Sequence, residues 1–122
     1  MYTAYVLTDE SRSQLENKYP PKYPKFIGHH VTVDFGVPAD AEAPEEATVK
    51  VLGSVDSGDG LQALVVSVND ETKRPDGNKY HITWSLDSEK YAPKDSNTLL
   101  QDKYMYTMSL PKVIDTTPEV LK

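Results

Sequence analysis

Residues 28–36, GHHVTVDFG, place two adjacent histidines at the start of a short β-like run. Residues 79–87, KYHITWSLD, repeat the core of this run, with a histidine, an aliphatic residue, a threonine and an apolar residue in the same order. Side chains two apart in a strand lie on the same face, so each histidine shares a face with a threonine. The opposite faces are apolar enough to pack on a core: Val31, Val33 and Phe35 in the first run, and Ile82, Trp84 and Leu86 in the second.

Of the two adjacent histidines, His30 is the candidate for chemistry. His30 is in phase with Thr32, whereas His29 falls on the apolar face with Val31 and is expected to be a structural or edge histidine. In the second run the corresponding pair is His81 and Thr83.

The rest of the chain alternates short β-like runs with turn signals. A helix is expected over Asp9 to Lys18, with Thr8 as its N-cap and Pro20 and Pro21 beyond its end. A second, shorter helix is expected within residues 94–103, capped at Asp95 or Ser96. The expected strands are residues 2–7, 26–36, 79–86 and 104–110, with a hairpin of residues 47–55 and 61–68 around the turn DSGDG.

This arrangement predicts a single domain over residues 1–122. With about six strands and one or two helices, it belongs to the α+β class with mainly antiparallel pairing. The tail, residues 111–122, is not assigned a structure, and 122 residues suit one compact domain.

Composition limits the kinds of partner. The net charge is −6, from 13 basic and 19 acidic residues, which has the wrong sign for gripping a long nucleic acid. No apolar run is long enough to span a bilayer, no signal peptide is recognised, and there is no cysteine. A soluble, cytoplasmic protein with no membrane partner is therefore expected, and its oligomeric state is left open.

Two His-x-Thr pairs supply the groups for phosphodiester hydrolysis. The two side chains of a pair lie roughly 6 to 7 Å apart along a strand, so both can reach one phosphate group. One neutral imidazole can activate water while a protonated one gives a proton to the leaving oxygen. The threonine hydroxyls would donate hydrogen bonds to the non-bridging oxygens. His30 and His81 are the expected catalytic pair, with Thr32 and Thr83 as phosphate binders.

Two other uses of these residues stay open at this point. A zinc site normally needs a third protein ligand, and Asp34 lies about 13 Å along the strand from His30, too far for both to hold one ion. Some other carboxylate could be brought in by the fold. The motifs could also be ordinary strand residues without a chemical role.

The motifs HHVTV and YHITWSL resemble the paired His-x-Thr/Ser motifs of the 2H phosphoesterase superfamily. That group includes 2′,5′ RNA ligase-like proteins, the cyclic phosphodiesterase domain of fungal tRNA ligases, and phage and viral enzymes that cleave cyclic oligonucleotide signals. The resemblance implies a bilobed fold of two antiparallel sheets around a cleft, with one motif per lobe. It also implies acid–base catalysis by His30 and His81, phosphate binding by Thr32 and Thr83, and no metal or cofactor.

With its short distance between the motifs, the chain most resembles the compact phage-type members of this superfamily. This resemblance favours a small nucleotide or cyclic oligonucleotide as substrate, or RNA ends bearing a cyclic phosphate. Tyr5 on the first strand is a candidate for base stacking, or else a half-buried strand tyrosine. Lys73 and Arg74 are expected to close over the ligand from a loop, or else to be solvated loop charges.

The function expected from the sequence is a phosphodiesterase that hydrolyses a cyclic or 2′-linked phosphodiester in a small nucleotide. A binding module that sequesters such a nucleotide without turnover is the alternative, and a structural or interaction domain is a third reading.

Overall fold

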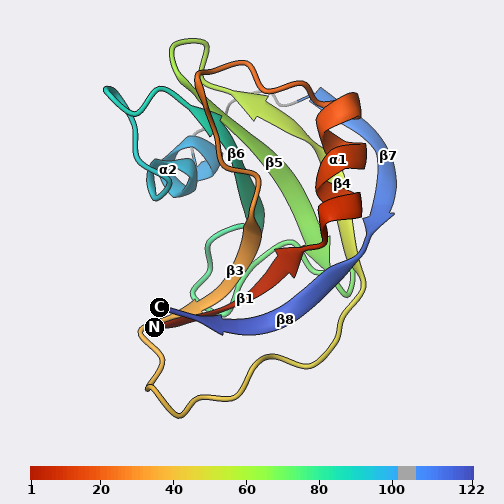
Figure 1. Ribbon diagram of the computed structural model, residues 1–122, viewed down its shortest axis with the longest axis vertical. Helices are drawn as coiled ribbons and strands as arrows, with labels where there is room; N and C mark the ends of the chain where they lie inside the picture. The colour runs from red at the N-terminus through yellow and green to blue at the C-terminus, as the bar shows by residue number, and fades with distance from the viewer. Residues whose placement is uncertain (102–106) are drawn as a thin grey trace.

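In the part of the chain that the structure describes, two antiparallel sheets and two helices build the fold, which confirms the predicted α+β class (Figure 1). The computed structural model describes residues 1–101 and 107–122, and side chains within 1–100 and 110–122. The helices are α1 (Asp9–Lys18) and α2 (Asp95–Gln101). The strands are β1 (Tyr2–Leu7), β2 (Lys25–Phe26), β3 (His30–Phe35), β4 (Val49–Asp56), β5 (Leu61–Val68), β6 (His81–Leu86), β7 (Thr107–Ile114) and β8 (Thr116–Leu121).

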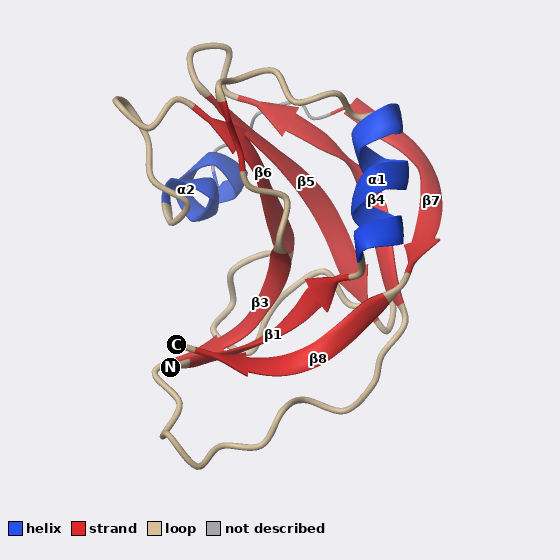
Figure 2. Cartoon of the chain, viewed as in Figure 1, coloured by secondary structure: helices blue, strands red, loops and turns tan. Residues whose placement is uncertain are grey.

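The smaller sheet has the order β3-β1-β8 (Figure 2), and the larger one has the order β2-β6-β5-β4-β7. Each sheet contains one of the two motif strands at or near its edge, β3 in the first and β6 in the second. Because β3 and β6 also lie against each other, the two motifs meet where the sheets adjoin.

The expected helix over residues 9–18 and the hairpin β4–β5 are confirmed. The Thr8 hydroxyl accepts a hydrogen bond from the backbone N–H of Ser11, at 3.2 Å, as an N-cap does. Helix α2 lies within the second expected helix, and β7 includes the described part of the expected closing strand. The parts of those two expectations that fall on residues 102–106 lie outside the described residues.

One expectation about the strands was wrong, and one strand was not predicted. Residues 26–36 do not form one strand, because β2 ends at Phe26 in the larger sheet and β3 begins at His30 in the smaller one. The tail contains β8, which pairs with β1 along its whole length and brings the two ends of the chain together (Figure 1).

The larger sheet is covered on both faces, as the burial of its central strand β5 shows. All eight of its residues are buried, as expected for a central strand with no solvent face. One face packs on a core shared with the smaller sheet and α1, and includes Leu15, Val31 and Trp84. The other packs on α2 through Leu99 and Leu100. The helix α2 is thereby held beside the motif strand β6.

Neither of the two described helices combines the length and the apolar character needed to cross a lipid bilayer.

Candidate active site

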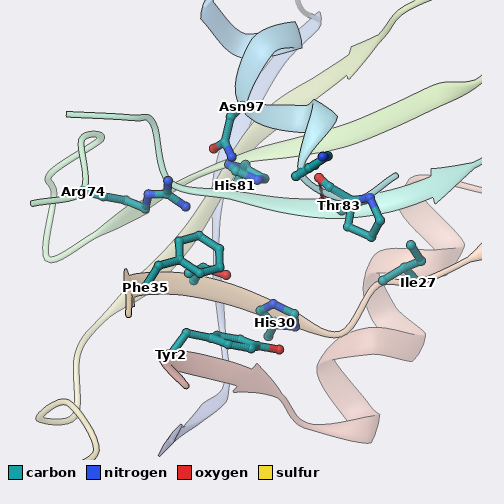
Figure 3. A pocket seen from close by; sticks show the side chains of 11 residues that line it. Tyr2, Ile27, His30, Phe35, Arg74, His81, Thr83 and Asn97 are labelled. Carbon is teal, nitrogen blue, oxygen red and sulfur yellow. Dashed lines mark hydrogen bonds between the residues drawn. The ribbon is translucent and has the colours of Figure 1, made fainter. Parts of the chain in front are cut away.

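A cavity of about 270 Å³ opens between the two motif strands (Figure 3). It is lined by residues of β1 and β3 on one side and of β6, the β5–β6 loop and the start of α2 on the other. The lining residues are Tyr2, Ile27, His30, Thr32, Phe35, Arg74, His81, Thr83, Pro93, Lys94 and Asn97.

Five of the seven residues proposed from the sequence therefore meet in one place. His30 and Thr32 come from β3, His81 and Thr83 from β6, and Arg74 from the loop before β6. The two histidines face the cavity from opposite sides (Figure 3). The strand phase inferred for both motifs is thus the one that the structure has.

Backbone hydrogen bonds hold the two motifs in register. The N–H of Ile27 donates to the carbonyl of Trp84 at 2.9 Å, and that of Gly28 donates to the carbonyl of Thr83 at 3.1 Å. The guanidinium of Arg12 adds hydrogen bonds to the carbonyls of Ile27 and Gly28. The segment that leads into His30 is therefore attached directly to the strand that carries His81.

Gly28 permits this close approach. Its φ of +46° is in the left-handed region, and a Cβ atom there would lie 2.6 Å from the ring of Phe26 and 2.9 Å from that of Trp84. Side chains other than hydrogen do not fit this position without displacing one of the rings. The turn at Gly28 also ends the strand phase that the sequence had extended through residues 26–36.

His81 is buried and its orientation is fixed. Its Nδ1 lies 2.9 Å from the carbonyl oxygen of Lys79. A carbonyl can only accept, so Nδ1 donates this bond and the neutral ring presents an unprotonated Nε2. Burial, followed by the charge of Arg74, lowers the pKa of His81, although the hydrogen bond to Lys79 opposes the shift.

His30 is half-buried, and burial together with the charges of His29 and His81 lowers its pKa to about 4. Both histidines are therefore neutral at pH 7. A bound phosphodiester would raise both pKa values, because an anion close to an imidazole favours its charged form.

His29 does not lie on the apolar face, which corrects the expectation from strand phase. It is exposed, outside β3, and its Nδ1 lies 3.0 Å from the Nδ1 of His30. The turn at Gly28 precedes it, so His29 does not follow the alternation of the strand. Its ring contacts the ring of His30 edge-on.

The two threonines differ in their surroundings. The buried Thr32 hydroxyl makes no side-chain hydrogen bond with another described residue, and it lines the cavity. The Thr83 hydroxyl donates to the carbonyl of Pro93, at 3.2 Å, and lies 2.9 Å from the hydroxyl of Ser96. Thr83 therefore also ties the start of α2 to β6.

Arg74 is almost completely buried, and its guanidinium is clamped by Asp76. Nε and Nη2 donate to the two carboxylate oxygens at 3.2 and 2.8 Å. Burial alone would raise the pKa of Asp76, but the hydrogen bonds from Arg74 and from the backbone of Asn78 outweigh it and lower the pKa. A guanidinium has five N–H donors, so the clamp leaves donors for a ligand in the cavity.

Two residues proposed as ligand contacts, Tyr5 and Lys73, do not line the cavity. Tyr5 pairs with Val31 on the core side of the smaller sheet, where its ring is buried and its hydroxyl donates to the carbonyl of Glu45. It cannot stack on a base in the cavity. Lys73 is exposed and is not among the residues that line the cavity, so the basic loop contributes only Arg74.

Sequence reasoning also missed several lining residues. Phe35 was expected on the core face with Val31 and Val33. The pairing of β1 with β3 shifts by one residue, with Thr3 opposite Asp34 and Ala4 opposite Thr32. This bulge at Val33 breaks the alternation, and Phe35 lines the cavity with 59% of its surface exposed.

The other missed residues are Tyr2, which pairs with Phe35, Ile27 before β3, Pro93 and Lys94 just before α2, and Asn97 in its first turn. The motif KDSN at residues 94–97 was interpreted only as a helix start. The carbonyl oxygen of the Asn97 side chain is buried and has no hydrogen-bond partner among the described residues.

Within the described residues, no three histidine, aspartate or glutamate side chains gather as a metal site would require. Comparison of the chain with protein-family models, with curated proteins and with solved structures gave no match. The resemblance to the 2H phosphoesterases therefore rests on the motifs and stays a prediction.

Proposed function

We propose that the protein is a 2H-type phosphodiesterase, which hydrolyses a cyclic or 2′-linked phosphodiester in a small nucleotide without a metal ion. The observation that carries this proposal is the convergence of His30 and His81, from two different sheets, on one cavity that also contains Thr32 and a buried Arg74.

The hydrogen bonds of the two histidines suggest different roles. His81 has its Nδ1 occupied by the carbonyl of Lys79, and its free Nε2 acts as the general base that takes a proton from the attacking water. His30 has its Nδ1 beside His29, and in its protonated form its Nε2–H gives a proton to the leaving oxygen.

The remaining groups act on the phosphate. As water adds to phosphorus and the bond to the leaving oxygen breaks, negative charge builds on the non-bridging oxygens. Arg74 and Thr32 stabilise this charge, Arg74 as a guanidinium already held in place by Asp76 and Thr32 as a hydroxyl donor. Thr83 contributes once its hydroxyl exchanges a partner on the α2 side for the phosphate.

Binding of the anionic substrate also favours protonation of His30. Because the pKa of His30 is about 4 without substrate, few molecules at neutral pH hold the proton that the acid must deliver. A phosphodiester beside His30 raises this pKa, so the proton is taken up with the substrate.

The lowered pKa values favour one alternative, a module that sequesters the nucleotide without turnover. In that case neutral histidines would serve as hydrogen-bonding groups only. Recovery of an unchanged nucleotide in stoichiometric amounts after overnight incubation would support sequestration and refute the enzyme.

The direct test is a substrate panel read by chromatography. It contains 2′,3′-cyclic mononucleotides, RNA ends bearing a cyclic phosphate, linear 2′,5′-linked dimers, and cyclic di- and trinucleotides. We expect hydrolysis of at least one class, abolished in both His30→Ala and His81→Ala. The position of the phosphate in the product identifies the leaving oxygen.

A further inference from the structure

One end of the cavity carries a row of aromatic rings that the proposed chemistry does not use. The ring of Tyr2 lies 5.3 Å from that of His30 and 5.6 Å from that of Phe35, tilted by 40° in both pairs. The row therefore extends from a catalytic group to the rim of the cavity (Figure 3).

Phe35 is placed to offer its ring to a ligand. More than half of its surface is exposed although it lines the cavity, and the guanidinium carbon of Arg74 lies 5.4 Å from the ring centre. An exposed aromatic face beside a phosphate-binding group is the arrangement on which nucleobases stack.

Across the cavity, Asn97 has an unused acceptor. Its side-chain carbonyl oxygen is buried and lacks a hydrogen-bond partner among the described residues, while the side chain lines the same cavity as Phe35 (Figure 3). Buried polar atoms are nearly always hydrogen-bonded, so this oxygen is available to accept a hydrogen bond from a ligand in the cavity.

We propose that Tyr2, Phe35 and Asn97 form a nucleobase subsite that selects adenine and cytosine, whose N6 and N4 amino groups occupy the position where guanine and uracil carry the carbonyl oxygens O6 and O4. This inference rests on the proposed function, which places the phosphate of the same ligand between His30 and His81. The base stacks on Phe35, and its amino group donates to the Asn97 carbonyl. Asparagine pairs with the amino edge of adenine in this way. The O4 atom of uracil would instead present an acceptor to an acceptor.

Four ligands that share the cyclic phosphodiester test the subsite. They are 2′,3′-cyclic AMP, 2′,3′-cyclic CMP, 2′,3′-cyclic UMP and glycerol 1,2-cyclic phosphate, which has no base. We expect kcat/KM to be highest for the first two. Asn97→Leu should lower it for them by roughly 10- to 100-fold and leave the glycerol ester unchanged. Phe35→Ala should lower it for all three nucleotides.

Val113→Ala is the matched control, because Val113 has the same exposed fraction, 59%, as Phe35 but lies on β7 away from the cavity. It removes an exposed apolar side chain without touching the subsite and should leave all four rates unchanged. Equal kcat/KM for all four ligands, unaffected by Asn97→Leu and Phe35→Ala, would overturn the subsite while the phosphodiesterase stands.

Ligand binding, measured in a variant that cannot turn the substrate over, tests the nucleobase subsite independently of the phosphodiesterase activity. In a Phe35→Trp, His30→Ala double variant, stacking of 2′,3′-cyclic AMP should quench the new indole, while glycerol 1,2-cyclic phosphate should not. Quenching in this variant, combined with no hydrolysis by the unmodified protein, would support the subsite and refute the enzyme. Absence of quenching by both cyclic AMP and cyclic CMP would refute the subsite.

Discussion

The Nδ1 atom of His29 lies 3.0 Å from the Nδ1 atom of His30, within hydrogen-bonding distance. Only one of the two nitrogens can carry the hydrogen of such a bond. When His30 is protonated, both of its ring nitrogens carry hydrogen, so its Nδ1–H donates to the Nδ1 of His29 and its Nε2–H remains for the cavity. An exposed histidine outside the strand is therefore positioned to orient the ring of the proposed acid.

Replacement of His29 with alanine tests this relationship. We expect kcat to fall by about 10-fold, well short of the 10²- to 10⁴-fold that removal of an acid–base group costs. Burial and the neighbouring charge of His29 both lower the pKa of His30, so loss of that charge should raise it. The acidic part of the pH profile should shift toward higher pH. Unchanged rates and an unchanged profile would show that the contact has no catalytic role.

The pH dependence of the unmodified protein follows from two lowered pKa values. Activity requires one proton on the pair, so kcat/KM should be bell-shaped. Both histidines of the free protein have pKa values below the usual 6.5, so the maximum of kcat/KM should lie below pH 6.5. A bound phosphodiester raises both values, and the profile of kcat should therefore lie at higher pH than that of kcat/KM. Coincident profiles with a maximum above pH 8 would contradict the two-histidine mechanism.

The sequence predicted the two histidines and two threonines of the proposed site better than the rest of the cavity lining. His30, Thr32, His81 and Thr83 alternate with buried apolar residues, and this alternation is a local property that survives folding. Phe35 was misplaced because the bulge at Val33 arises from pairing with β1, which the sequence of β3 alone does not encode.

The choice of Tyr5 as a base-stacking candidate failed for a similar reason. Which face of β1 lines the cavity depends on the strands that pair with it. Tyr5 lies opposite Val31 on the core side. Strand β8 was missed because Pro118 argues against a strand. As an edge strand paired only with β1, β8 tolerates a residue without an N–H.

The two threonines should respond differently to removal of the hydroxyl. Thr32→Val should lower kcat by something on the order of 10- to 1000-fold, because the hydroxyl stabilises the transition state, with little change in melting temperature. Thr83→Val should lower kcat and also stability, since its hydroxyl holds Pro93 and Ser96.

Ser96→Ala is the control for the structural part of the Thr83 effect. It removes the contact with α2 but leaves the Thr83 hydroxyl in place. If Ser96→Ala slows the reaction as much as Thr83→Val does, Thr83 acts only through the position of α2. Wild-type rates in Thr32→Val would exclude phosphate binding by Thr32.

Gly28 should tolerate an added Cβ atom less well than Gly36 does. Gly28→Ala puts a Cβ against the rings of Phe26 and Trp84 at a positive φ, and we expect it to lower the free energy of unfolding by roughly 2–4 kcal/mol. Gly36→Ala is the matched control, because its φ is also positive but no atom lies within 4 Å of the added carbon. It should cost only about 1–2 kcal/mol. Equal losses in denaturant titrations would disprove the proposed ring contact.

Exhaustive dialysis against a chelator separates acid–base catalysis from metal catalysis. If the histidines move protons, dialysis should leave kcat/KM and its bell-shaped pH profile unchanged, and added zinc or manganese should not increase the rate. If the histidines hold a metal ion that activates water, dialysis should remove activity and one of these ions should restore it. Loss of activity in His30→Ala and His81→Ala does not distinguish the two, because metal ligands are essential too. Restoration by metal would therefore end the two-histidine mechanism, even with both histidines proven indispensable.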